Sequence, residues 1–131
     1  MKVFKFSLRV RYTETDQMQV AYYGSYFVWF EVARTEAFRE LGLEYSKLEE
    51  EGFYLMVAQA GCQYKAPCKY DDLITIHTTI SEVKNSSLSF DYQVYKDAKL
   101  LALGETTHVF CNKKGKPLRI PPRIKEIINK I

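Results

Sequence analysis

Asp16 stands shortly before a long aromatic run with helical spacing, in the segment RYTETDQMQVAYYGSYFVWFEVARTEAF. Strand-like alternation continues up to Tyr12, a polar loop carries Asp16, and the helical spacing begins near Ser25. A carboxylate beside a helix start lies close to backbone N–H groups that lack an intrahelical acceptor and that polarise a carbonyl group. This pairing suits hydrolysis of an activated acyl group. The carboxylate either attacks the carbonyl carbon or activates a water, and the N–H groups of Tyr23 and Gly24 stabilise the oxyanion.

Other interpretations of the same residues stay open. Asp16 alone is equally typical of a loop or capping aspartate. Glu31 is a second candidate carboxylate, and Arg34 follows it at the i, i+3 spacing of a helical ion pair. Arg34 falls within the apolar arc of the helix and therefore needs a partner of opposite charge. The simpler interpretation is a structural ion pair between Glu31 and Arg34, and the alternative is that Glu31 is a second catalytic carboxylate. Tyr12 and Tyr26 are predicted to lie in the core.

Metal chemistry is not indicated. The histidines, His77 and His108, stand apart on strand-like segments, where we expect them to face solvent or a subunit contact. The three cysteines are odd in number, lack the spacing of a metal site and are predicted to be reduced structural thiols: Cys62, Cys68 and Cys111. We therefore expect no bound metal.

The composition indicates one globular domain of 131 residues, with 47% hydrophobic and 27% charged residues. A net charge of +3 is too small to predict nucleic-acid binding. No apolar run approaches the roughly 20 residues that span a bilayer. The alternating start MKVFKFSLRVRY does not resemble a signal peptide, so a cytoplasmic location is expected.

The periodicity predicts a strand, a long helix, a short helix, four consecutive strands and a final short helix. In order, the predicted ranges are 3–12, a helix from Ser25 to Leu41, 44–51, 53–65, 72–83, 87–96, 99–111 and 122–130. Ser25 is the predicted N-cap of the long helix, and Gly42 is its C′ residue. This order predicts an α+β fold in which one helix is wrapped by an antiparallel five-stranded sheet. Such a sheet keeps an open edge, so a homodimer or homotetramer is expected.

The order of elements and the motif together resemble the hotdog fold, and more narrowly the acyl-CoA thioesterases of the 4-hydroxybenzoyl-CoA thioesterase type, including the Tol-Pal-associated subfamily. The resemblance covers nearly the whole chain. It is carried by Arg11-Tyr12, Thr15-Asp16, Val20, Tyr22, Ser25-Tyr26, Phe30-Glu31, Ala33-Arg34-Thr35-Glu36, Pro67, Asp71-Asp72-Leu73, Gly104, Thr107-His108-Val109-Phe110, Gly115-Lys116-Pro117 and Ile120-Pro121.

The resemblance implies hydrolysis of an acyl-CoA thioester to a free acid and CoA, without a metal or organic cofactor. The implied catalytic residues are Asp16, Tyr23 and Gly24, and the candidate substrate-binding residues are Tyr26, Lys65 and Lys69. Two departures stand in the loop. Gln17-Met18-Gln19 replaces a glycine found in many relatives, and Tyr23 stands where many relatives carry a histidine.

Two rival functions remain. A hotdog dehydratase usually pairs a histidine with a carboxylate, and no histidine lies near the predicted start of the helix in the sequence. A non-catalytic module that binds acyl-CoA or an acyl carrier protein would keep ligand binding but would show no turnover. The acyl group itself is not predicted by the sequence.

Overall fold

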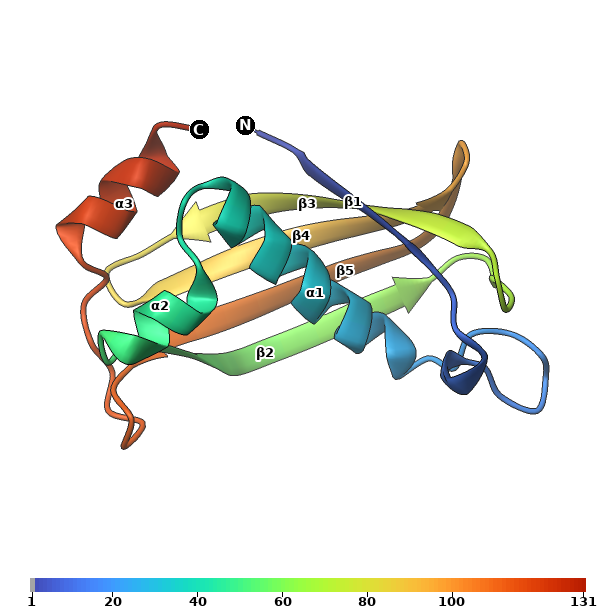
Figure 1. Ribbon diagram of the computed structural model, residues 1–131, viewed down its shortest axis with the longest axis horizontal. Coiled ribbons are helices and arrows are strands. Elements are labelled where there is room, and N and C mark those ends of the chain that lie inside the picture. The colour runs from blue at the N-terminus through green and yellow to red at the C-terminus, as the bar shows by residue number, and fades with distance from the viewer. Residues whose placement is uncertain (1) are drawn as a thin grey trace.

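The computed structural model describes residues 2–131 and contains one antiparallel sheet crossed by a long helix (Figure 1). The strand order in the sheet is β1-β3-β4-β5-β2. In chain order the elements are β1 (Phe4–Arg9), α1 (Ser25–Glu40), α2 (Tyr45–Glu50), β2 (Tyr54–Tyr64), β3 (Leu73–Val83), β4 (Ser87–Lys96), β5 (Lys99–Cys111) and α3 (Pro122–Asn129). The predicted hotdog architecture is confirmed, and the predicted bounds agree with the structure within one residue except at the end of the first strand.

The packing of α1 explains why its apolar arc is so wide. Trp29, Phe30 and Phe38 are each at most 1% exposed, and all three point into the core formed with the sheet. The Phe30 ring stacks on Tyr92 of β4 with 4.3 Å between ring centroids and 11° between planes. A Cβ atom at Gly104 of β5 would collide with the same ring. Glycine at this position therefore lets α1 lie close to the sheet.

The two ends of α1 differ in how well they match the sequence prediction. Gly24, not Ser25, is the N-cap, with helical φ and ψ of −67° and −24°. An added Cβ at Gly24 would lie 2.9 and 3.2 Å from two ring carbons of Tyr22, so a larger residue there would have to displace this exposed ring. Ser25 instead donates its hydroxyl proton to the Glu14 carbonyl oxygen at 3.0 Å. Gly42 ends the helix with φ of +78°, as predicted.

The first strand is shorter than predicted. It ends at Arg9, and a 3₁₀ turn occupies Tyr12–Glu14. Tyr12 is 76% exposed, so its predicted place in the core is wrong. Its ring instead packs edge-on against Tyr70 at 5.7 Å, on the surface.

Strand β2 forms one edge of the sheet, because its only partner in the described chain is β5. Five consecutive residues of β2, from Met56 to Ala60, are exposed, and the Met56 and Val57 side chains remain about half accessible. None of the helices in residues 2–131 is both long enough and apolar enough to cross a membrane. The three cysteines are free thiols.

Candidate active site

The loop that carries Asp16 is held by a second acidic residue, Glu14. Its carboxylate is 7% exposed and accepts hydrogen bonds from the Arg11 backbone N–H at 2.7 Å, Arg11 Nη2 at 3.2 Å and Trp29 Nε1 at 2.9 Å. Burial raises the pKa of Glu14, but these hydrogen bonds and the Arg11 charge outweigh it and hold that pKa below its usual value. Sequence reasoning missed Glu14, although its i, i+3 spacing from Arg11 was a usable signal.

The main chain of Glu14 ties the loop to the start of α1. Its carbonyl oxygen accepts a hydrogen bond from the Tyr22 N–H at 2.7 Å in addition to that from the Ser25 hydroxyl. A bridge between Thr15 and Ala21 then closes the loop. Glu14 is therefore the residue through which the loop and α1 keep a fixed relative position.

Asp16 lies at the surface on this frame. Its N–H donates to the Val20 carbonyl at 3.0 Å, and its Oδ1 accepts from the Met18 N–H at 2.8 Å. The other carboxylate oxygen, Oδ2, has no donor among residues 2–131. Asp16 borders an open hollow of about 320 Å³ together with Tyr23, Tyr26 and Lys65. One oxygen of the carboxylate thus orients the side chain, and the other remains available to a reactant.

Two backbone donors stand free beside this carboxylate. The Tyr22 and Ser25 N–H groups bond to the carbonyls of Glu14 and Tyr22, respectively, whereas neither Tyr23 nor Gly24 has an acceptor for its N–H within residues 2–131. The Tyr64 hydroxyl donates to the Tyr23 carbonyl oxygen at 2.8 Å. The Tyr23 carbonyl and the Gly24 N–H belong to the same planar peptide group, so the hydrogen bond from Tyr64 also fixes the direction of the Gly24 N–H. Tyr64 was not among the predicted site residues, since β2 lies forty positions further along the chain.

The three predicted substrate-binding residues differ in exposure and in which hollow they border. Lys65 is exposed and borders the hollow that contains Asp16, whereas Lys69 borders a second hollow on the other side of Asp16. Tyr26 is 2% exposed, and its hydroxyl contacts Cys68 Sγ at 3.6 Å. Burial raises the pKa of Tyr26 well above its usual value, so its hydroxyl is a poor proton donor. Tyr26 lies in the core, as predicted, and contributes to the wall of the hollow.

Comparison with known proteins assigns the chain to a family. The model of the thioesterase-like superfamily matches residues 10–128. The chain belongs to the thioesterase-like superfamily. An acyl-CoA thioesterase of Haemophilus influenzae, YbgC, is 34% identical over 93% of this chain and 91% of its own length. An acyl-CoA thioester hydrolase of Escherichia coli is 31% identical over 92% of this chain and 88% of its own.

Solved structures agree with this assignment. A DHNA-CoA thioesterase from Staphylococcus aureus superposes with a TM-score of 0.95 at 27% identity, covering 99% of this chain and 91% of the other. A 4-hydroxybenzoyl-CoA thioesterase superposes with a TM-score of 0.89 at 19% identity, covering 98% of this chain and 99% of the other, so this thioesterase has the same hotdog fold. The finer assignment to the Tol-Pal-associated subfamily stays a prediction.

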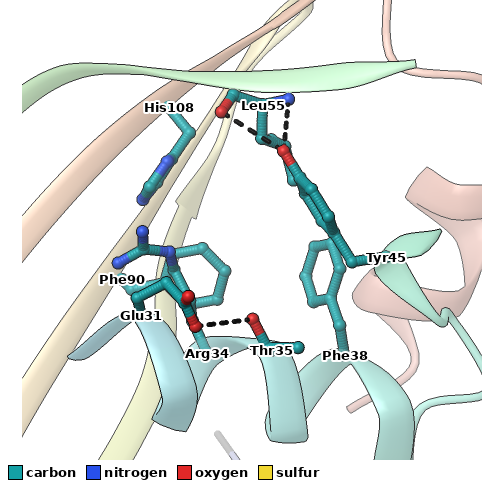
Figure 2. A pocket seen from close by; sticks show the side chains of 8 residues that line it. All are labelled: Glu31, Arg34, Thr35, Phe38, Tyr45, Leu55, Phe90 and His108. Atoms are coloured by element: carbon teal, nitrogen blue, oxygen red, sulfur yellow. Dashed lines mark hydrogen bonds between the residues drawn. The ribbon is translucent and has the colours of Figure 1, made fainter. Parts of the chain in front are cut away.

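The second candidate carboxylate of this thioesterase lies in a different pocket, towards the C-terminal half of α1 (Figure 2). Glu31 accepts a hydrogen bond from Thr35 Oγ1 at 3.4 Å. The predicted Glu31–Arg34 ion pair is wrong, because no carboxylate of residues 2–131 lies within 4.0 Å of the Arg34 guanidinium. Both side chains line this pocket, Glu31 as an exposed residue and Arg34 as a partly buried one.

His108 of this thioesterase is less exposed than predicted, whereas His77 stays partly accessible. His108 is only 1% exposed and lines the same pocket as Arg34, so the predicted solvent-facing position is wrong. Burial and then the Arg34 charge lower the pKa of His108 to about 4. His77 is half-buried, with its ring 4.8 Å from that of Tyr95. Within residues 2–131, no three His, Cys, Asp or Glu side chains gather closely enough to hold a metal ion.

Proposed function

We propose that the chain is an acyl-CoA thioesterase in which Asp16 performs the chemistry. One observation carries the proposal: within residues 2–131 the Asp16 carboxylate keeps one oxygen without a donor at an open hollow that Tyr23 also borders, and the N–H groups of Tyr23 and Gly24 have no acceptor. Membership of the thioesterase-like superfamily supports the reaction class, and the names of the Haemophilus and Escherichia relatives support an acyl-CoA substrate.

Two routes lead to the same products. As a nucleophile, Asp16 attacks the thioester carbon, the C–S bond breaks and the thiolate leaves as CoA. Water then hydrolyses the resulting anhydride and restores the carboxylate. As a general base, Asp16 instead takes a proton from water while the water oxygen attacks, and the departing sulfur receives a proton. Both routes give one free acid and one CoA thiol.

The backbone donors assist both routes. The carbonyl oxygen becomes negative in the tetrahedral state, and N–H groups already aimed at it need no reorganisation. Loss of one such donor typically costs about 3 kcal/mol of barrier height. The proposal assigns this role to the N–H groups of Tyr23 and Gly24. Lys65 and Lys69, on opposite sides of Asp16, are proposed to meet the phosphates of coenzyme A, with no metal or further cofactor.

The proposal includes a homodimer or homotetramer joined through β2. This edge strand is eleven residues long, and its exposed central stretch includes Met56 and Val57. Long apolar edges of this kind are normally paired or covered, because their free N–H and C=O groups otherwise recruit other chains. A second copy of β2 satisfies those groups by continuing the sheet. An acyl carrier protein is an alternative carrier of the acyl group.

The test compares two matched aspartate variants against a panel of acyl-CoA thioesters, with thiol release as the signal. Asp16→Asn is expected to lower kcat/KM at least 100-fold, because the amide is neither a nucleophile nor a base at neutral pH. Asp97→Asn, in an exposed hairpin turn, makes the same chemical change and is expected to leave kcat/KM within twofold. Equal turnover by wild type and Asp16→Asn would refute the assignment.

A single turnover in ¹⁸O-labelled water tests the nucleophilic route. Label found in the Asp16 carboxylate by mass spectrometry identifies that route with water attacking the Asp16 carbon, whereas label found only in the released acid results from the general-base route or from attack of water on the acyl carbon of the anhydride. Tight binding of acyl-CoA without turnover on any substrate would instead identify the non-catalytic binding module. Formation of an unsaturated acyl-CoA from a hydroxyacyl-CoA would identify the dehydratase.

A further inference from the structure

A partly enclosed pocket of about 150 Å³ lies between the C-terminal half of α1 and the sheet (Figure 2). It stands apart from the hollow of Asp16, since the two share no lining residue. Along α1, ten residues separate Gly24 from Arg34, a rise of about 15 Å. The residues that matter for its chemistry are Arg34, Phe38, Tyr45, Phe90 and His108.

Arg34 gives this pocket a positive charge, and no carboxylate of residues 2–131 forms an ion pair with it. The guanidinium is partly buried, and within residues 2–131 no carboxylate lies within 4.0 Å of it. Burial raises the pKa values of Tyr45 and Tyr92, and the Arg34 charge opposes both rises. Glu31, the carboxylate in the lining, is itself exposed to water. A charge in such a place costs free energy unless an anion accompanies it.

A chain of hydrogen bonds prepares His108 as a second donor. The Tyr92 hydroxyl lies 2.6 Å from Thr106 Oγ1, which lies 2.8 Å from His108 Nε2. The Thr106 hydroxyl has one proton and can donate it to His108 Nε2 when the Tyr92 hydroxyl donates to Thr106. In this arrangement the ring proton of neutral His108 is on Nδ1, which makes no hydrogen bond within residues 2–131.

The remaining walls of the pocket are apolar. Phe38 and Phe90 contribute rings whose centroids lie 5.7 Å apart, and Figure 2 shows both bordering the space between Arg34 and Tyr45. A cavity of about 150 Å³ is large enough for a single six-membered ring or a chain of similar volume. The pocket therefore combines one cation, one N–H donor and an apolar slot of limited size.

We propose that this pocket binds the carboxylate of a small organic acid, with Arg34 as its counter-ion, His108 Nδ1–H as a second donor and the Phe38 and Phe90 rings against its apolar part. The carboxylate belongs either to the far end of an acyl group or to a free acid such as a reaction product. This binding goes beyond thioester hydrolysis and does not require Asp16 to act.

A matched pair of probes tests the binding directly. Benzoate and benzamide have nearly the same shape, and only benzoate carries the charge. Calorimetry and ¹⁵N shift mapping on the wild type are expected to show benzoate binding at least tenfold more tightly, with shifts centred on Arg34 and His108. Arg34→Gln is expected to remove that preference. Arg39→Gln, which changes an exposed arginine of the same helix, is expected to keep it.

Turnover distinguishes the two sources of the carboxylate. If the acyl group supplies it, the chain must be long enough to span the rise from Gly24 to Arg34, and the ratio of kcat/KM for tetradecanedioyl-CoA to that for tetradecanoyl-CoA falls at least tenfold in Arg34→Gln. If a free acid supplies it, that ratio stays constant while benzoate binding is lost. Equal affinity for benzoate and benzamide, or benzoate binding unchanged in Arg34→Gln, would overturn the proposal. Asp16→Asn is expected to bind benzoate as tightly as the wild type does. A wrong assignment of Asp16 would therefore show in the turnover assay and leave the benzoate result unchanged.

Discussion

Replacing Glu14 by glutamine tests whether the buried carboxylate holds the loop of Asp16. Three donors converge on Glu14, two from Arg11 and one from the Trp29 indole. A glutamine side chain has one oxygen, and its NH₂ group must face at least one of these donors. Trp29 is 1% exposed and cannot turn its N–H to water.

The expected loss of folding free energy is about 2 kcal/mol. An unsatisfied buried donor costs about 1–3 kcal/mol, and a hydrogen bond to a charged group is worth about 1 kcal/mol more than a neutral one. The Arg11 side chain adds little, because it is 71% exposed and its ion pair is screened by water. For a chain of 131 residues, 2 kcal/mol corresponds to a fall in Tm of about 8 °C.

The measurement is urea denaturation at fixed protein concentration, followed by fluorescence of Trp29, the single tryptophan. Glu36→Gln is the control, since Glu36 forms an exposed ion pair with Arg39 at 3.4 Å and is expected to change stability by less than 0.5 kcal/mol.

The pH dependence has a defined sign. The folded pKa of Glu14 is lowered, so its contribution to stability is fully present above the unfolded pKa near 4.5 and is lost as the pH falls through the folded pKa. The difference between wild type and Glu14→Gln should therefore be constant above about pH 5.5 and should shrink below pH 4.5. A difference under 0.5 kcal/mol at pH 7, or one of equal size at pH 3.5, would refute this reasoning.

Three further outcomes are expected. Gly104→Ala should destabilise the fold by about 1–3 kcal/mol in urea, because the new methyl group meets the Phe30 ring; an unchanged midpoint would contradict the close packing. Tyr64→Phe removes the hydrogen bond to the Tyr23 carbonyl, which is worth about 0.5–1.5 kcal/mol, and should therefore lower kcat about 2- to 12-fold with little change in KM. A change in KM alone would argue against a positioning role for Tyr64. Val57→Lys should shift the sedimenting species to a smaller mass while the circular dichroism spectrum is retained, whereas an unaltered mass would remove β2 as the contact.

The fold was largely predictable because its signals are local. Alternation of side chains and glycine stops define most strands and helices within a few residues, and the order of elements then allows few topologies. The first strand failed for a tertiary reason. The backbone N–H of Val10 bonds to the Asp72 carbonyl, and the chain turns at Tyr12 although its pattern still alternates.

The site was predictable only in part, because its contacts join distant segments. Asp16 and the donors at the helix start are close in sequence, so their proximity could be inferred. Tyr64 belongs to β2, and its bond to Tyr23 depends on how that strand is placed. His108 alternates with Phe110 along β5 and both are buried, so strand alternation was a usable signal for the burial of His108.

The closed loop keeps Asp16 in place from both sides. Contacts between Thr15 and Ala21 and between Asp16 and Val20 complete its base, and Gln17, Met18 and Gln19 are exposed beyond them. Met18 and Gln19 supply backbone N–H groups to Asp16, and Gln19 has a φ of +66°, so a proline at either position would disturb the acidic group. The Gln17 side chain makes none of these contacts, and this exposed position can change in evolution or by engineering at little risk to the catalytic residue.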